Sequence, residues 1–260
     1  MKPRPIHRGW LTIHQPRPDA RLRLFCVPFA GAGASMFRTW AAHLPEAVEV
    51  CAVQLPGREN RVHEPLYTDM TRLVPAAADA LSPHLTKPFA FFGHSMGAHV
   101  AFELTRALRR RGGPLPRHLY VSGRWAPQIP PRDPPTYDLP DAEFRQELRR
   151  LNGGRQAASE SSELTTALLP MIRADFAICE TYAYEEGPPL ACPIAAWGGA
   201  NDPDVTVADV QAWRDQTTTS FSCDIMPGDH FFLLTSEEAF LASLSGRLAT
   251  LLETISSVHA

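Results

Sequence analysis

The chain has 260 residues, of which 44% are hydrophobic and 20% are charged, and its formal net charge is −3. This length and composition fit one globular domain with a sizeable core and argue against a disordered or fibrous chain. The charge, with no basic run interleaved with aromatic residues, excludes a strongly basic nucleic-acid binder.

Short apolar runs bounded by Pro or Gly predict a set of buried strands. These strands are expected at 22–27, 48–55, 89–92, 119–122, 194–197 and 221–226. Helix-like stretches lie between them, at 36–43, 70–85, 96–110, 207–215 and 237–252. Because strands alternate with helices, the sequence predicts an α/β fold in which helices cover both faces of a mostly parallel central sheet.

Proline is distributed unevenly along the middle of the chain. Six prolines fall within 127–140, whereas Pro170 is the only proline within 141–187. The proline-poor segment shows no strand pattern, and apolar residues at helical spacing predict two helices, over 141–151 and about 162–182. An all-helical insertion of this kind commonly forms a lid over the carboxyl ends of the strands; a surface hairpin without a functional role is the alternative.

The strongest local signal is Gly93-His94-Ser95-Met96-Gly97, a G-x-S-x-G motif between an expected strand and an expected helix. Glycine is needed on both sides of the serine because the turn is sharp and its backbone strained. The turn would expose Ser95 at the top of the sheet, with the positive end of the helix dipole behind it. Ser95 is therefore the predicted nucleophile.

A serine nucleophile needs a base, and in a strand-turn-helix site of this kind the chain order is Ser, then an acid, then His. The histidines after Ser95 are His99, His118, His230 and His259. His99 lies within the nucleophile helix, His118 precedes every plausible acid turn, and His259 is the next-to-last residue of the sequence. Only His230 follows both a late strand and a turn, so it is the predicted base.

The orienting acid is expected in the turn after the strand at 194–197. Asp202 closes this turn and is the first choice, with Asp204 as the alternative. Asp229 is too close to the histidine in sequence to reach its far nitrogen, and Asp224 lies inside a strand.

Two backbone N–H groups are needed to bind an oxyanion. One is expected from Met96, the residue after the nucleophile, and the other from the small-residue loop 28–34, where we choose Ala30. The same loop is not a dinucleotide turn, because Gly31-x-Gly33 lacks the third glycine and an acidic ribose partner.

Cysteine usage and hydropathy suggest the compartment. The five cysteines are widely spaced, with no C-x-x-C pair, which argues against a disulfide framework or a zinc site. The first ten residues lack the apolar core of a secretory signal, and no run of eighteen apolar residues is present. We therefore expect a cytoplasmic protein without a metal and without a membrane partner.

Five segments, in the right order and covering nearly the whole chain, resemble the type II thioesterases of the α/β-hydrolase superfamily. These segments are 28–33, Leu-Pro-Gly-Arg at 55–58, 93–98, 199–205 and His-Phe-Phe-Leu at 230–233. Members of this family are stand-alone editing enzymes of polyketide and nonribosomal peptide synthases, which make antibiotics and related compounds. The resemblance implies an α/β-hydrolase core formed by 1–126 and 188–260, with 127–187 inserted as a helical lid.

The resemblance also implies the substrate, an acyl group held as a thioester on the phosphopantetheine arm of an acyl or peptidyl carrier protein. Ser95 would attack the thioester, His230 would act as base and Asp202 would orient His230, without any cofactor. We expect a monomer. Arginines of the insertion could contact an acidic carrier protein or simply be solvated: Arg145, Arg149, Arg150 and Arg155.

Other functions use the same residues. A general carboxylesterase or lipase would have the same triad, and an acyltransferase would differ only in the acceptor of the acyl group. A non-catalytic binding protein on this fold would normally have lost part of the triad, which is complete in this sequence.

Overall fold

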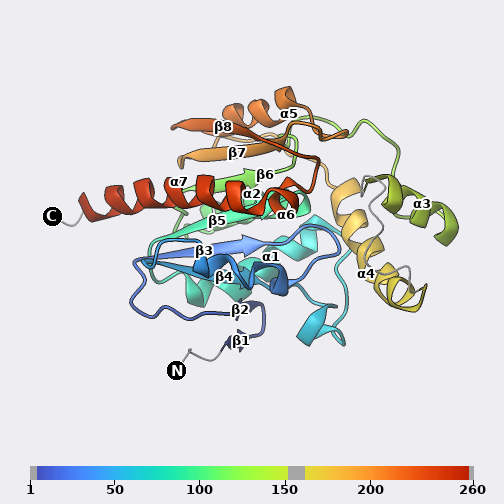
Figure 1. Cartoon of the computed structure of the whole chain (residues 1–260), viewed down its shortest axis with the longest axis horizontal. Helices are drawn as coiled ribbons and strands as arrows, with labels where there is room; N and C mark the ends of the chain where they lie inside the picture. The colour runs from blue at the N-terminus through green and yellow to red at the C-terminus, as the bar shows by residue number, and fades with distance from the viewer. Residues whose placement is uncertain (1–4, 152–161, 258–260) are drawn as a thin grey trace.

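The computed structural model describes residues 5–151 and 162–257, and their strands form one sheet in the order β1-β2-β4-β3-β5-β6-β7-β8 (Figure 1). The strands are β1 Ile6–Arg8, β2 Leu11–Ile13, β3 Leu22–Val27, β4 Val48–Val53, β5 Phe89–His94, β6 Leu119–Ser122, β7 Ile194–Gly199 and β8 Phe221–Met226. All pairings from β4 to β8 are parallel, whereas β1 and β2 pair in antiparallel fashion at one edge. The predicted parallel sheet is confirmed. Strands β1 and β2 were not predicted, and they have only three residues each.

Seven α-helices occur in the described part of the chain. They are α1 Met70–Leu81, α2 Met96–Arg110, α3 Asp141–Leu151, α4 Ser162–Glu180, α5 Val207–Gln211, α6 Phe232–Thr235 and α7 Glu237–Ser257. In Figure 1, α7 crosses one face of the sheet and α1 and α2 lie behind it. None of the described helices has the length and apolar character required to cross a membrane.

The prediction of a helix at 36–43 was wrong. Two short 3-10 helices occupy this region, Ala34–Phe37 and Trp40–Ala42. Phe37 ends the first of these helices and Trp40 begins the second. Both rings are buried, with their centroids 4.8 Å apart. The two short helices thus bring these rings together in the core, in place of the continuous α-helix that the sequence pattern predicts.

Strand β5, which leads to the nucleophile, is buried on both faces of the sheet. Phe89 and Phe91 belong to the core beneath α1 and α2, whereas Ala90 and Phe92 belong to the core beneath α7. Such a strand gives a continuous apolar run rather than an alternating pattern. Its carboxyl end is thereby fixed between two cores.

The insertion contributes α3 and α4, which lie beyond the carboxyl ends of the parallel strands (Figure 1). Helix α4 ends at Glu180, two residues before the expected end. Within the described residues of 141–186 there is no strand, as the sequence pattern predicts.

Two buried histidines should make the fold sensitive to acid. Burial lowers the pKa of His94 and of His99 well below the ordinary value of 6.5. Below about pH 6.5 the unfolded chain therefore binds protons that the folded chain does not, so stability falls as the pH falls. Between about pH 7.5 and about pH 5.5 we expect these two groups to lower the free energy of unfolding by about 3 kcal/mol in urea titrations.

His99→Gln separates this effect from general acid unfolding. Its amide can replace the His99 Nε2 group that donates to the Trp125 carbonyl oxygen at 3.0 Å, but it does not titrate. The loss of stability between the two pH values should then shrink by about half. Equal losses in the wild type and the variant would contradict the assignment.

Candidate active site

Ser95 lies in the sharp turn between β5 and α2. Its φ of 53° and ψ of −117° are unusual for a residue with a side chain. A Cβ at Gly93 would lie 2.0 Å from the carbonyl oxygen of Gly97, and a Cβ at Gly97 would lie 2.2 Å from the carbonyl oxygen of Val27. Both glycines of the motif are therefore required for the close approach of backbone to backbone.

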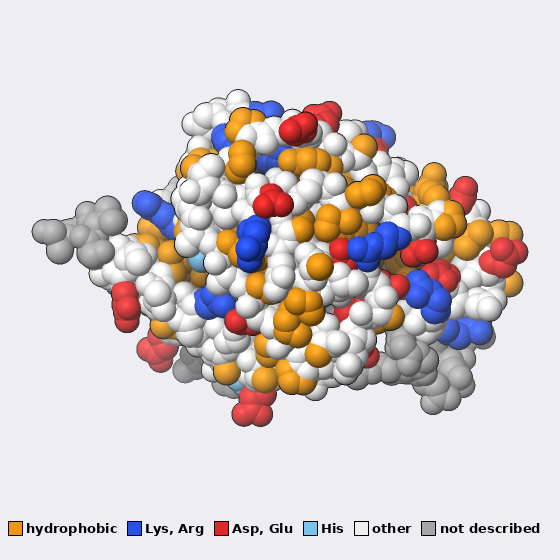
Figure 2. Space-filling model, turned by 90° about the horizontal axis from the view of Figure 1, so that it is seen from above, with side chains coloured by type: hydrophobic (Ala, Val, Ile, Leu, Met, Phe, Trp, Pro, Cys, Tyr) orange, Lys and Arg blue, Asp and Glu red, His pale blue; other side chains and the backbone are white. Residues whose placement is uncertain are grey.

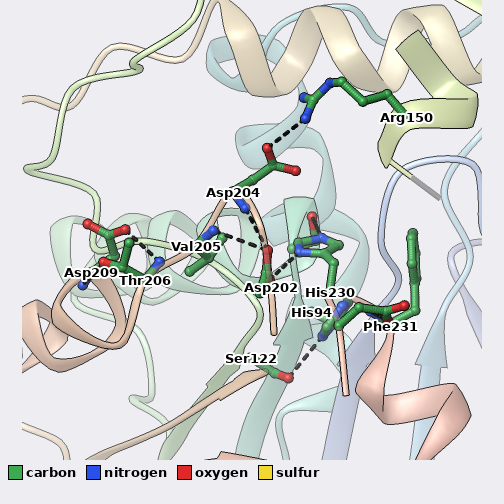
Figure 3. Close-up of polar contacts among 12 residues, drawn as sticks. His94, Ser122, Arg150, Asp202, Asp204, Val205, Thr206, Asp209, His230 and Phe231 are labelled. Carbon is green, nitrogen blue, oxygen red and sulfur yellow. Dashed lines mark hydrogen bonds and ion pairs between the residues drawn. The ribbon is translucent and has the colours of Figure 1, made fainter. Parts of the chain in front are cut away.

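His230 makes hydrogen bonds through both ring nitrogens. Nε2 lies 3.0 Å from Ser95 Oγ, and Nδ1 lies 2.7 Å from Asp202 Oδ2 (Figure 3 shows the latter contact). The Asp202 side chain is fully buried and that of His230 is 16% exposed. A carboxylate can only accept, so Nδ1 carries the proton and donates it to Asp202, and Nε2 is left to accept from the Ser95 hydroxyl. The structure thus brings the three predicted residues into one hydrogen-bonded chain.

The two candidate acids have different partners. The second oxygen of Asp202 accepts from the backbone N–H groups of Asp204 and Val205, at 3.0 and 3.1 Å. The Asp204 side chain instead pairs with Arg150 of α3, with Oδ1 and Nη1 3.1 Å apart (Figure 3). Asp202, and not Asp204, is the acid that contacts His230.

The acid turn and the histidine loop pack against each other through their backbones. A Cβ at Gly199 would lie 2.3 Å from the carbonyl oxygen of Asp229, and the Asn201 N–H donates to the carbonyl oxygen of Gly228 at 2.9 Å. The φ of Gly228 is +114°, a conformation that favours glycine. These contacts hold the turns that carry Asp202 and His230 in a fixed relation.

His94, which was not among the predicted site residues, packs against this site. Its Nδ1 lies 2.9 Å from Ser122 Oγ on β6, and its ring centroid is 5.3 Å from that of His230 and 5.6 Å from that of Phe232. The side chain is completely buried, so it packs beneath His230 as a neutral ring. The motif position next to Ser95 was its only signal in the sequence.

The two predicted oxyanion donors differ from the N–H groups beside them in the loop. Two of these neighbours already form hydrogen bonds: the Gly31 N–H donates to Asp175 Oδ2 at 2.8 Å, and the Ala32 N–H donates to the Phe29 carbonyl oxygen at 3.1 Å. The N–H groups of Ala30 and Met96 donate to no described group. Since the close contact of Gly97 brings the start of α2 against the loop after β3, both groups are available on neighbouring segments.

No cluster of metal-binding side chains occurs among the residues that the structure describes. The side chains that the structure brings together are a serine, a histidine and a carboxylate in one hydrogen-bonded chain. This arrangement can form and hydrolyse an acyl-enzyme.

Comparisons with known proteins agree on one family. A family model described as thioesterase domain matches residues 22–248. Linear gramicidin dehydrogenase LgrE of Brevibacillus parabrevis is 48% identical to this chain over 246 residues, which are 94% of each protein.

Solved structures give the same result. RedJ, a thioesterase from the prodiginine biosynthetic pathway in Streptomyces coelicolor, is 44% identical with a TM-score of 0.83, over 89% of this chain and 88% of RedJ. YbtT, a type II thioesterase from the yersiniabactin NRPS/PKS biosynthetic pathway, is 30% identical with a TM-score of 0.82, over 94% of this chain and 99% of YbtT. This chain is thus similar to biosynthetic thioesterases along almost its entire length.

Proposed function

The chain belongs to the thioesterase family, and from this premise we propose that it removes aberrant or stalled acyl groups from the carrier proteins of a polyketide or nonribosomal peptide synthase. It is a thioester hydrolase of the serine-hydrolase type on an α/β-hydrolase fold. The observation that carries the proposal is the hydrogen-bonded chain of Ser95, His230 and Asp202 within the part of the sequence that matches the family.

In the proposed first step, Ser95 Oγ attacks the thioester carbonyl carbon while its proton passes to His230 Nε2. The negative charge that develops on the carbonyl oxygen is bound by the N–H groups of Met96 and Ala30. The C–S bond then breaks, and His230 returns the proton to the pantetheine sulfur. Asp202 holds His230 in the required tautomer and stabilises the imidazolium that forms between these events.

The second step releases the acid. His230 Nε2 accepts a proton from a water molecule, whose oxygen attacks the ester carbonyl of the acyl-enzyme. The bond between the carbonyl carbon and Ser95 Oγ breaks, and Ser95 recovers its proton from His230. The products are the free acid and the unmodified serine.

The partner and setting belong to the same proposal: a carrier protein, a monomeric enzyme without a cofactor, and the cytoplasm. We further propose that 127–187 acts as the lid. Its arginines differ in whether they are available to bind an acidic partner. Arg149 is exposed, but Arg150 already pairs with Glu147 and Asp204, and Arg155 lies outside the described residues. On the face seen in Figure 2, basic and acidic side chains are interspersed, also over the insertion at the right.

The name of LgrE describes a dehydrogenase, an activity that this site does not support. A dinucleotide turn needs a third glycine and a following α-helix whose N-terminus faces the pyrophosphate. In this chain the third position is Met36, and the loop after β3 leads into the short 3-10 helix Ala34–Phe37.

Mass spectrometry of a carrier protein loaded with short acyl groups tests the proposal. We expect the wild type to remove the acyl mass and release the free acid, and Ser95→Ala to leave the carrier loaded. If the wild type spares the acyl carrier but cleaves matched simple esters, the protein is a carboxylesterase and the proposal is wrong. Transfer of the acyl group to an added alcohol or amine would instead indicate an acyltransferase.

A further inference from the structure

A buried carboxylate of the insertion contacts the loop that carries the proposed oxyanion donor. Asp175, on α4, is completely buried. Its Oδ2 accepts from the Gly31 N–H at 2.8 Å and from Arg58 Nη1 at 2.7 Å, and its Oδ1 accepts from Arg58 Nη2 at 2.6 Å. Arg58 is only 4% exposed, so the ion pair is shielded from water and salt.

The partners of Asp175 hold the same loop at further points. Arg58 Nη1 also donates to the carbonyl oxygen of Ala32 at 2.9 Å. Gln54 accepts from the Ala34 N–H at 2.7 Å and donates to the carbonyl oxygen of Arg58 at 2.9 Å. His14 Nε2 also donates to the carbonyl oxygen of Ala34, at 3.0 Å. The backbone from residue 31 to residue 34 is therefore held by four side chains that come from outside the loop.

The contact with Asp175 bears on the least restricted residue of the loop. Gly31 has a φ of +84°, and glycine populates many other conformations as readily. The orientation of the Ala30 N–H depends on the backbone beside it. Helix α4 packs closely here, because a Cβ added at Gly31 would lie only 3.3 Å from Ile172, one turn before Asp175.

We propose that Asp175 is a positioning residue that holds the Ala30 N–H in place for the oxyanion, so that the insertion helix α4 is a structural part of the oxyanion site. The inference rests on the proposed function, because it assumes that Ala30 is an oxyanion donor. A consequence is that a lid movement that lifts α4 away from Gly31 would switch off catalysis as well as open the site.

The test uses Asp175→Asn and Arg58→Lys in the full chain. The asparagine removes the charge that binds Arg58, and the lysine keeps a charge pair but cannot reach both carboxylate oxygens and the Ala32 carbonyl oxygen together. With an acyl N-acetylcysteamine thioester, we expect kcat to fall about 10- to 100-fold for Asp175→Asn and less for Arg58→Lys, with KM within about threefold of the wild type.

An alkyl boronic acid separates positioning from general destabilisation. It forms a tetrahedral adduct with a serine nucleophile, in which one oxygen takes the place of the oxyanion. Its affinity should fall by the same factor as kcat. Glu49→Gln is the matched control, because this buried carboxylate also binds one backbone N–H, of Arg17, and one arginine, Arg23, at the start of β4. The control should lose stability but keep its kcat and its boronate affinity.

The inference is overturned if folded Asp175→Asn or Arg58→Lys keeps the wild-type kcat and boronate affinity, or if Glu49→Gln lowers both to the same extent. These results are distinct from a failure of the proposed function. In that case the wild type itself would not hydrolyse the thioester, or Ser95→Ala would still do so.

Discussion

Asp202→Asn is expected to lower kcat on an acyl thioester by about 10⁴-fold, whereas Asp204→Asn should leave it within about threefold of the wild type. An asparagine at 202 can donate to His230 Nδ1 and so favours the tautomer whose Nε2 carries the proton. That nitrogen can then no longer accept the proton of Ser95. The ring stays in place, so the loss should be in kcat rather than in KM.

The Asp204 variant is a matched control for the Asp202 variant, because the same chemical change is made only two residues away in the same turn. Its side chain contacts Arg150 and not His230, and its backbone N–H, which donates to Asp202, is kept in the variant. Steady-state kinetics of both variants at one pH are sufficient. Similar losses in the two variants would mean that His230 is not oriented by Asp202 alone.

The contrast between these two aspartates shows which parts of the site the sequence predicts and which it leaves open. The motif around Ser95 and the chain order of serine, acid and histidine follow from local sterics and from the fold, so the sequence alone predicts these three residues. Spacing favoured Asp202 but left Asp204 open. Only the geometry of the turn, in which Asp202 binds two backbone N–H groups and His230, separates them.

The supporting contacts could not be found in this way. Arg58 and Asp175 are 117 residues apart, and they come from a turn and from the insertion. Neither residue carries a local pattern that predicts the other, since the pair exists only through tertiary packing. The same holds for Phe37 and Trp40, whose burial accompanies 3-10 turns in a segment that the local pattern assigned to a helix.

Gly97→Ala is expected to damage both the fold and the activity. The added Cβ would lie 2.2 Å from the carbonyl oxygen of Val27 and 2.8 Å from that of Pro28. Both atoms belong to the backbone and cannot rotate away, so α2 must move from the loop after β3. We expect a loss of about 3 kcal/mol or more in the free energy of unfolding. We also expect a fall of about 10²-fold in kcat, because a shift of about 1 Å misplaces Ser95 and the Met96 N–H.

Gly246→Ala is the matched control. Gly246 lies within α7, and a Cβ there would meet no atom within 4 Å. Alanine should stabilise this helix by about 0.5–1 kcal/mol and leave kcat unchanged. Urea titration and thioester kinetics on both variants therefore test the steric argument. Because the chemical change is the same in both, a Gly97→Ala protein as stable and active as Gly246→Ala would show that the start of α2 has more freedom than the contacts of Gly97 allow.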